Sequence, residues 1–430
     1  MTQLRSWLRA LVLAVVSAAF LAPSVAMAAG KGKEDAVLKS SGRKSPKAKS
    51  TAKGSRMLNK AYDLTVDEKW DEALAELDKL LSGNPSPYEK SKAHQFRASI
   101  YYEKDQMDLA AAESKAAIEA DGLPNNEHLD AMLSYAQMLY NSEKFDESIK
   151  AYEAYIADAP QVKGEAYASL AASYYEKEEW AKAAENVDKA IATGDKAQAN
   201  WYQIKINALY QSEDYAASIV FLKELLAKEP NNMQFNNMLV SSYLQSEQDK
   251  EALDHLLAMK SGGMFDSELL WKQLYQLYQA NDQWVESTAI IEEGLAAGGL
   301  KPVADVYIDL GEAWFAAADG LEEKQTAQRN ENMGKALAAF DKASAVATNG
   351  TPDLWRCQIL LDQDKAAEAA TACGSAHAKG GLKDEGNAHY LHGVALFESG
   401  KVAEARAALT KALGFNESKR NAETMLGNLR

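Results

Sequence analysis

The chain has 430 residues, of which 47% are hydrophobic and 25% are charged, and its formal net charge is −15 at pH 7. This hydrophobic fraction is large enough for a buried core and excludes a chain that is disordered throughout. The excess of acidic residues excludes nucleic acid as an expected partner, because a phosphate backbone binds basic surfaces.

Residues 1–28 have the order of a secretory signal peptide. A basic start with Arg5 and Arg9 is followed by an apolar run over 10–21 and by small residues at 26–28. The run is short for a membrane span, so we expect cleavage after Ala28 rather than an uncleaved anchor. No later segment is apolar enough to cross a bilayer. The sequence therefore predicts an exported protein with no transmembrane segment after signal cleavage.

Residues 29–56 are rich in Lys, Ser and Gly, and they include nine Lys or Arg but only two acids. Such a segment buries too little apolar surface to offset its ordering entropy, so it is predicted to be a disordered basic tether. It serves either as a plain linker or as a patch that rests on anionic head groups or on the acidic body. Residues 1–56 carry +9, which leaves −24 on residues 57–430. This charge favours basic partners, or it serves only to keep the surface soluble.

From residue 57 onward, apolar residues recur at helical spacing in pairs of segments that short turns separate. One residue, small or compact in most units, marks the point in the first helix of each pair where the two helices should cross. These crossing residues are Ala61, Ala98, Ala136, Ala171, Ile206, Val240, Tyr275, Gly311, Cys357 and Gly393. An aromatic residue often begins the second helix: Trp70, Phe145, Trp180, Tyr215 and Trp284. Most intervals are about 34 residues or slightly longer, a period that resembles the tetratricopeptide-repeat family.

The resemblance implies an all-α fold, a right-handed superhelical solenoid of about ten helix-turn-helix units over residues 57–415. One helix pair cannot bury its own apolar face, so successive units must stack. Residues 416–430 are expected to form a C-terminal capping helix. An insertion at about 319–333 falls in the eighth unit, and it forms either an extended helix pair or a protruding loop, with a neutral or a recognition role.

The only two cysteines, Cys357 and Cys373, fall in the ninth unit, where its two helices should meet. In an oxidising compartment they are expected to form a disulfide, which would contribute about 3 kcal/mol. The alternative is a metal site that adds His389 and His392, which share a helix face at a spacing of three. These histidines also fall at core positions, so no metal is predicted.

No catalytic motif is evident in the chain. It lacks a Gly-rich phosphate loop, a GxSxG elbow, an HExxH helix and an EF-hand loop. Its six histidines are scattered, with no nucleophile at a defined spacing. We therefore expect a protein that is not an enzyme and has no cofactor, although a site assembled across repeats would leave no motif.

In tetratricopeptide proteins the first helices line a groove, and this resemblance suggests a protein-binding groove here. Tyr recurs at an exposed position just past the crossing residue, and amides lie between these rings. Tyr offers contact area at low entropy cost and amides pair with an extended peptide, but packing alone also explains Tyr at this position. Gln203 stands where a Lys that holds acidic C-terminal tails would be, so an extended, neutral-to-basic segment is the predicted ligand. The candidate residues are Tyr102, Tyr140, Tyr175, Tyr210, Gln137, Gln203, Asn207 and Asn237.

Three stretches, together with the signal peptide and tether, resemble the exported repeat proteins encoded beside TonB–ExbB–ExbD systems of Gram-negative bacteria. The resemblance implies a periplasmic adaptor that binds envelope proteins such as TonB-system components and assists the uptake of iron complexes or other nutrients. A coordinator of cell-wall or outer-membrane assembly, or of polysaccharide export, is the alternative scaffold. A metal-binding or hydrolase-associated subunit is the alternative of another class. The stretches are AYDLTVDEKWDEALAELDKLL (61–81), SPYEKSKAHQFRASIYYEKDQMDLAAAESKAAIEADGL (86–123) and LSYAQMLYNSEKFDESIKAYEAYI (133–156).

Overall fold

The computed structural model describes residues 35–429, apart from the side chain of Glu323. The described residues form helices and connecting segments, with no strand among them. The chain divides into two compact units, unit 1 up to Leu225 and unit 2 from Leu226 onward. The fold of the described residues is therefore all-α, as the sequence predicts. The predicted signal peptide, residues 1–28, and the first six residues of the predicted tether, 29–34, lie outside the described residues.

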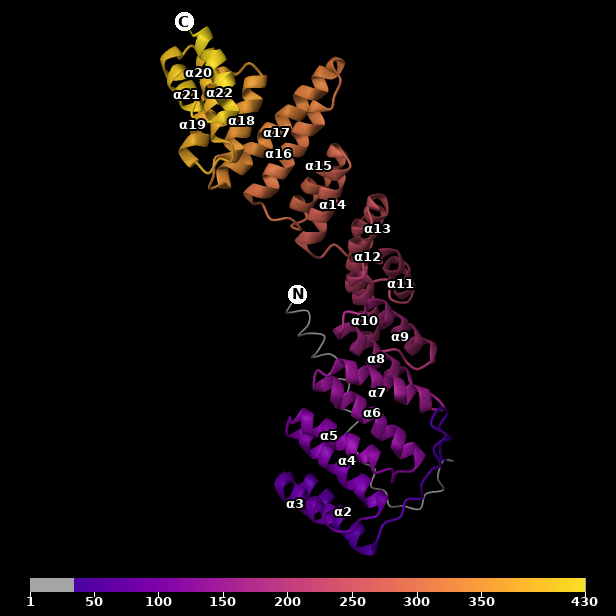
Figure 1. The fold of residues 1–430 in the computed structure, drawn as a ribbon. Coiled ribbons are helices and arrows are strands. Elements are labelled where there is room, and N and C mark those ends of the chain that lie inside the picture. The colour runs from indigo at the N-terminus through magenta and orange to yellow at the C-terminus, as the bar shows by residue number, and fades with distance from the viewer. Residues whose placement is uncertain (1–34, 430) are drawn as a thin grey trace. The chain divides into compact units, whose positions relative to one another are not determined.

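Unit 1 is a succession of helix pairs in chain order (Figure 1). Each pair joins a first helix to a second helix through a short turn, and each pair packs on the next. The helices are α2 (Ala52–Val66), α3 (Trp70–Leu81), α4 (Pro87–Glu103), α5 (Met107–Glu119), α6 (Asn125–Asn141), α7 (Phe145–Asp158), α8 (Gly164–Glu176), α9 (Trp180–Ala192), α10 (Ala199–Gln211) and α11 (Tyr215–Lys228).

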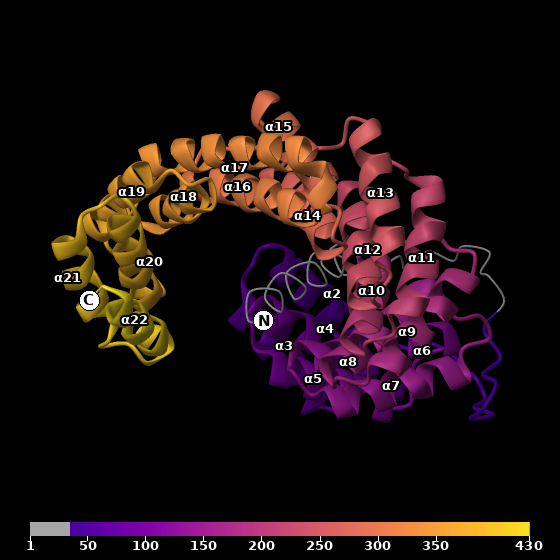
Figure 2. The same cartoon turned by 90° about the horizontal axis from the view of Figure 1, so that it is seen from above.

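Unit 2 continues the same arrangement, and in Figure 2 α14, α16 and α18 form one row while α15, α17 and α19 form a second row. Its helices are α12 (Met233–Gln245), α13 (Asp249–Ser261), α14 (Glu268–Ala280), α15 (Trp284–Ala296), α16 (Ala304–Asp319), the short 3-10 helix η1 (Glu323–Gln325), α17 (Thr326–Val346), α18 (Thr351–Asp362), α19 (Ala366–Lys379), α20 (Glu385–Glu398), α21 (Val402–Ala412) and α22 (Asn416–Asn428). The last helix, α22, packs on α20 and α21.

All ten crossing residues are buried, which is what the sequence predicts for them. Two are glycines because a neighbouring side chain fills the space that a β-carbon would need. A Cβ at Gly311 would lie 2.7 Å from the ring of Phe340, and one at Gly393 would lie 2.6 Å from Leu409. Two helices can approach closely only where one of them is small, so these positions set how tightly each pair packs.

The first helix of most pairs ends in the same hydrogen-bonded turn. In α8 the N–H of Glu178 bonds to the carbonyl of Tyr175, and the N–H of Glu179 reaches back to Tyr174, both at 3.0 Å. This is a Schellman turn, which requires a residue with positive φ. That residue is acidic in eight pairs, with φ between 56° and 60°: Glu68, Asp105, Glu143, Glu178, Glu213, Glu247, Asp282 and Asp364.

The insertion at about 319–333 extends a helix pair and does not form a protruding loop. Its residues form η1 and the first turns of α17, which is 21 residues long. Asn332 is buried and donates to the carbonyl of Ala317 on α16, at 3.2 Å, and Met333 is 7% exposed. The extra turns therefore belong to the packed pair α16–α17.

Residues 35–51, here called the strap, differ from the disorder predicted for 29–56. The strap contains no helix, but Leu38 is 3% exposed and Arg43 forms an ion pair with Asp121. Residues 52–56 are already the first turn of α2, which Thr51 caps by accepting from the N–H of Gly54 at 2.9 Å. The prediction of disorder is wrong here because it averages composition, whereas the contact depends on a few side chains that meet prearranged partners.

Candidate protein-binding surface

Two of the four tyrosines predicted to line a groove instead pack inside the turn of their own helix pair. Tyr140 and Tyr175 are 8% and 9% exposed, so the expectation that this position is exposed is wrong for both. Tyr175 meets Trp180 edge to face, with ring centroids 4.9 Å apart, and Tyr140 meets Phe145 in the same way at 5.5 Å. Tight packing of the turn, the alternative left open by the sequence, therefore accounts for these two rings.

The other two tyrosines of the series keep more contact with solvent. Tyr102 at the end of α4 and Tyr210 at the end of α10 are half-buried. Tyr210 also packs on the ring that begins the next helix, since its centroid lies 5.4 Å from that of Tyr215. The same contact between two aromatic rings across the helix turn thus recurs in a third pair.

Three of the four predicted amides are also engaged within their own helix or helix pair. Gln137 accepts a hydrogen bond from the hydroxyl of Tyr152 at 2.8 Å and donates to Asn141 at 3.0 Å. Gln203 donates to Asn207 at 2.8 Å, one turn further along α10. Asn237 on α12 is exposed. The structure thus joins Gln203 to Asn207 but does not present the eight predicted residues as one open surface.

A second surface, which the sequence analysis did not single out, lies on the first helices of unit 2. We call it the α16 face and define it as Asp305, Asp309, Glu312, Phe315 and Trp355. The three carboxylates fall four and then three residues apart, so they share one side of α16. This spacing is the signal from which the face was predictable.

Hydrogen bonds tie the α16 face to the neighbouring first helices. The hydroxyl of Tyr275 on α14 donates to Asp309 at 2.6 Å, and the indole N–H of Trp355 on α18 donates to Glu312 at 3.1 Å. Phe315 lies against Trp355, with ring centroids 5.2 Å apart. Three successive first helices therefore contribute to one surface of carboxylates and aromatic rings.

The charge on the α16 face is poorly compensated. Burial raises the pKa of Asp309, and Asp305 adds to this rise, although the hydrogen bond from Tyr275 and the charge of Lys272 oppose it. The surrounding helices remove part of the hydration of Glu312, which raises its pKa, and Asp309 raises it further. A cation placed over this face would relieve both effects.

Two arrangements in the ninth and tenth pairs bear on the metal alternative. Cys357 and Cys373 form a disulfide, with Cα atoms 5.2 Å apart, so they offer no thiolate. The rings of His377 and His389 stack with centroids 4.2 Å apart, and His392 lies 5.3 Å from His377. Among residues 35–429 no group of three or more His, Cys, Asp or Glu is arranged to hold a metal ion.

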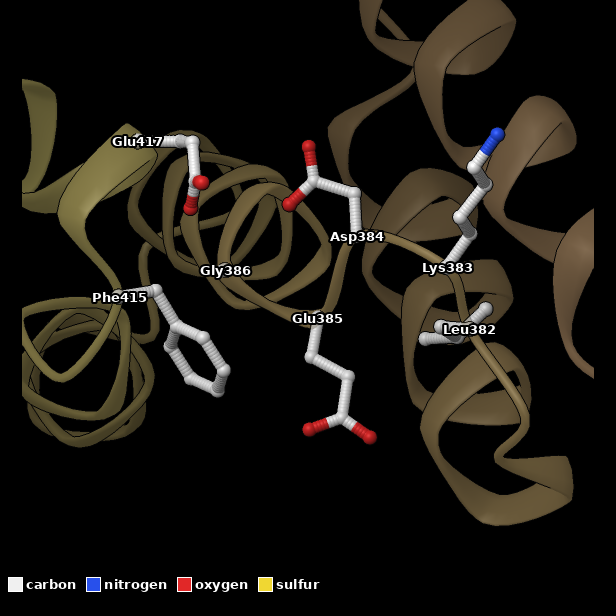
Figure 3. A pocket seen from close by; sticks show the side chains of 7 residues that line it. All are labelled: Leu382, Lys383, Asp384, Glu385, Gly386, Phe415 and Glu417. Carbon is white, nitrogen blue, oxygen red and sulfur yellow. The ribbon is translucent and has the colours of Figure 1, made fainter.

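A surface depression of about 520 Å³ lies beside the N-terminus of α20 (Figure 3). Asp384 is already used as the cap of α20, since it accepts from the N–H of Asn387 at 2.9 Å. Figure 3 shows that Lys383 and Glu385 point away from the space between Asp384 and Glu417. The depression therefore brings together no set of side chains that would perform chemistry.

None of the described helices is both long and apolar enough to span a membrane.

Comparison with known proteins gives a match to one family and several distant structural likenesses. A family model described as tetratricopeptide repeat matches residues 356–421. No curated protein matches the sequence. The structure of Naa15/Naa10 bound to HypK-THB is 12% identical, with a TM-score of 0.45 over 87% of this chain and 60% of that chain.

Two bacterial repeat proteins give similar values. A tetratricopeptide repeat protein from Parabacteroides merdae is 12% identical, with a TM-score of 0.37 over 69% of this chain and 94% of that chain. The C-terminal part of a repeat protein from Cytophaga hutchinsonii is 17% identical, with a TM-score of 0.38 over 63% and 98%. These scores carry no argument about function or family. The described residues form an all-helical array of paired helices, of which residues 356–421 match the tetratricopeptide repeat.

Proposed function

We propose that this protein is an interaction scaffold that holds an extended, basic segment of a partner protein on the α16 face. The observation that carries the proposal is the row of carboxylates on α16, which lies beside Phe315 and Trp355. The carboxylates attract Lys or Arg, whose charge would oppose the desolvation that raises the pKa of Asp309 and Glu312, and the two rings offer apolar contact and cation–π attraction. The net charge of −24 on residues 57–430 adds long-range attraction for the same partner.

The cellular role that fits this surface is that of a periplasmic accessory to TonB-dependent energy transduction and to the uptake of iron complexes. The resemblance of 61–81, 86–123 and 133–156 to repeat proteins encoded beside such systems supports this role. A Lys- and Pro-rich periplasmic segment of a TonB protein has the charge and extended form that the α16 face would accept.

Calorimetry with a synthetic Lys- and Pro-rich peptide tests the binding surface. The triple variant Asp305→Asn, Asp309→Asn and Glu312→Gln is expected to bind about tenfold more weakly than wild type, since exposed ion pairs contribute roughly 0.2–1 kcal/mol each. The matched control is Glu251→Gln, Glu368→Gln and Glu404→Gln, which removes three exposed carboxylates elsewhere in unit 2. Equal weakening in both variants would show that only net charge matters and would reject the α16 face.

Co-purification from an envelope extract tests the cellular role. Recovery of TonB-system components with wild-type protein, and their loss with the triple variant, would support it. Recovery of cell-wall synthases alone would overturn the TonB assignment and favour the wall-assembly alternative.

A further inference from the structure

The strap fills one continuous site at the edge of unit 1, beside the N-terminus of α6. The carboxylate of Asp35 accepts hydrogen bonds from the N–H groups of Asn125 and Asn126, at 3.1 and 2.9 Å. The first turn of a helix leaves such N–H groups without a partner, so Asp35 completes the start of α6. Burial alone would raise the pKa of Asp35, but these bonds and one from Ser45 hold it below its usual value.

The next contact uses only the main chain of the strap. The N–H groups of Ser40 and Ser41 donate to the carboxylate of Asp158 at the end of α7, at 3.1 and 2.7 Å. The N–H of Lys39 donates to the carbonyl of Asp158 at 3.0 Å. Because no side chain of the strap takes part, these bonds would hold any segment that bends as residues 39–41 do.

An apolar socket receives one strap side chain. Leu38 is 3% exposed, whereas its neighbour Val37 is 80% exposed. The socket is formed by buried residues from α6, α7 and α8 and the α7–α8 connection: Leu129, Tyr155, Ala159 and Ala166. The site therefore selects one apolar residue and leaves the adjacent position free to vary.

Five residues further on, the site receives an arginine. Arg43 donates through Nε to Asp121 at 2.6 Å, through Nη1 to Asn125 Oδ1 at 2.5 Å, and through Nη2 to the carbonyl of Leu123 at 2.8 Å. Its side chain is 11% exposed. Three acceptors around one guanidinium form a geometry that the single ammonium of Lys cannot satisfy.

We propose that this edge of unit 1 is a peptide-binding site that the strap fills in cis. Its ligand in trans is a segment of a partner protein that carries an apolar residue five positions before an arginine and bends between the two as the strap does at 39–42, where Gly42 has φ 60°. The strap is suited to exchange, because it buries a single large apolar side chain. Residues 35–45, which make these contacts, also leave without unwinding a helix, since α2 begins at Ala52 and its cap is Thr51. The strap then acts as an intramolecular competitor of the partner.

Fluorescence anisotropy with a labelled peptide of residues 35–49 tests the site in the full chain. The variant Leu38→Ser with Arg43→Ser opens the site and is expected to bind the peptide at least tenfold more tightly than wild type, whose own strap competes. The control Lys44→Gln with Lys47→Gln changes two exposed strap residues and is expected to bind like wild type. A peptide with serine in place of its leucine and arginine is expected to bind the opened variant no more tightly than it binds wild type.

Two results would overturn the proposal: no binding of the peptide to an opened variant of unchanged helix content, or equal binding of the serine-substituted peptide. If the double variant loses helix content, Arg43→Gln alone replaces it in the test, because loss of the guanidinium contacts weakens the hold of the strap and lets the peptide displace it. Binding by that variant above the wild-type level supports the site, and its absence rejects it. The α16 face is the same in all these variants, so the difference in affinity between the opened variant and wild type is independent of that face.

Discussion

The aromatic residues at each helix turn hold the two helices of a pair together by ring contact. Tyr175 and Trp180 illustrate this, because their rings meet edge to face at 4.9 Å and Tyr175 is 9% exposed. Such a pair adds about 0.5–1.5 kcal/mol to the free energy gained by burying the rings. A substitution here therefore reports on folding before it reports on binding.

We predict that Tyr175→Ala lowers the free energy of unfolding of unit 1 by about 3 kcal/mol, as expected for removal of a buried aromatic ring. Urea denaturation followed by circular dichroism measures it. The matched variant Tyr175→Phe keeps the ring contact and is expected to retain most of the stability. A loss equal to that of Tyr175→Ala would show that the hydroxyl, and not the ring, holds the turn.

The acidic residue at the positive-φ position of each turn stores backbone strain. Glu213 is exposed at φ 58°, where its N–H bonds to the carbonyl of Tyr210 at 3.1 Å. A β-carbon in this conformation costs about 1–2 kcal/mol, which glycine avoids. Glu213→Gly is therefore expected to raise the stability of unit 1 by roughly 0.5–1 kcal/mol after the entropic cost of glycine.

The control for this substitution is Glu213→Ala, which removes the same carboxylate but keeps the β-carbon. If both variants gained equal stability in urea denaturation, relief of charge repulsion and not of strain would be the cause.

At the scale of single elements, the disulfide ties α18 to α19. Cys357 and Cys373 are 0% and 1% exposed and belong to the core that also includes α20, α21 and α22. The partner helix α19 is rich in alanine and buries few large side chains. The crosslink therefore replaces packing that α19 itself does not supply.

Reduction of this bond is expected to lower the free energy of unfolding by about 3 kcal/mol, the value for a closed loop of roughly 15 residues. Denaturation with and without a thiol reductant measures it. The variant Cys357→Ala with Cys373→Ala should be insensitive to the reductant. Two alkylated thiols found by mass spectrometry in unreduced protein would contradict the disulfide.

The histidine cluster joins α19 to α20 and makes this region sensitive to acid. Burial, together with the charges of His377, His389, Lys411 and Lys401, lowers the pKa of His392 to about 4. Burial also lowers the pKa of His377 and of His389; Lys411 acts in the same direction and Glu385 opposes it. All three rings are thus neutral in the folded protein at neutral pH.

Because the unfolded chain takes up protons near pH 6.5 and the folded chain does not, the stability from this cluster is complete above about pH 6.5. It is expected to fall as the pH drops from there toward 4. Urea denaturation across this range measures it, and His392→Gln should flatten the decline. An unchanged pH profile in that variant would remove His392 as the cause.

At the scale of the whole molecule, charge decides which partners approach. Residues 57–430 carry −24, so association with a basic peptide is steered by a field that salt screens. The affinity for a Lys- and Pro-rich peptide is expected to fall when ionic strength rises from about 0.01 to 0.15 M, where the Debye length shrinks from about 30 to 8 Å. Calorimetry at the two salt concentrations tests this, and equal affinities would exclude an electrostatic mode of binding.

Much of the fold was predictable, but less of the candidate site. The crossing residues and the cysteine pair follow from a regular helix-pair period, so each position inherits its environment from its neighbours. Tyr140 and Tyr175 recur with the same period, but the period does not show which way a ring points. The packing of the turn directs the two rings toward Phe145 and Trp180. The spacing of the carboxylates on the α16 face can be read from the sequence. The hydrogen bond from Trp355 to Glu312 cannot, because it joins two helix pairs that meet only when the chain packs.

The sequence by itself determined the paired helices, their small crossing positions and the partner of each cysteine. These features depend on contacts within a pair or between adjacent pairs, which a local pattern encodes. Tertiary structure alone decided that the strap is ordered, that Tyr140 and Tyr175 are buried, and that the insertion lengthens α17. The strap shows the reason, because Arg43 meets acceptors 78 to 82 residues away, which no local composition can reveal.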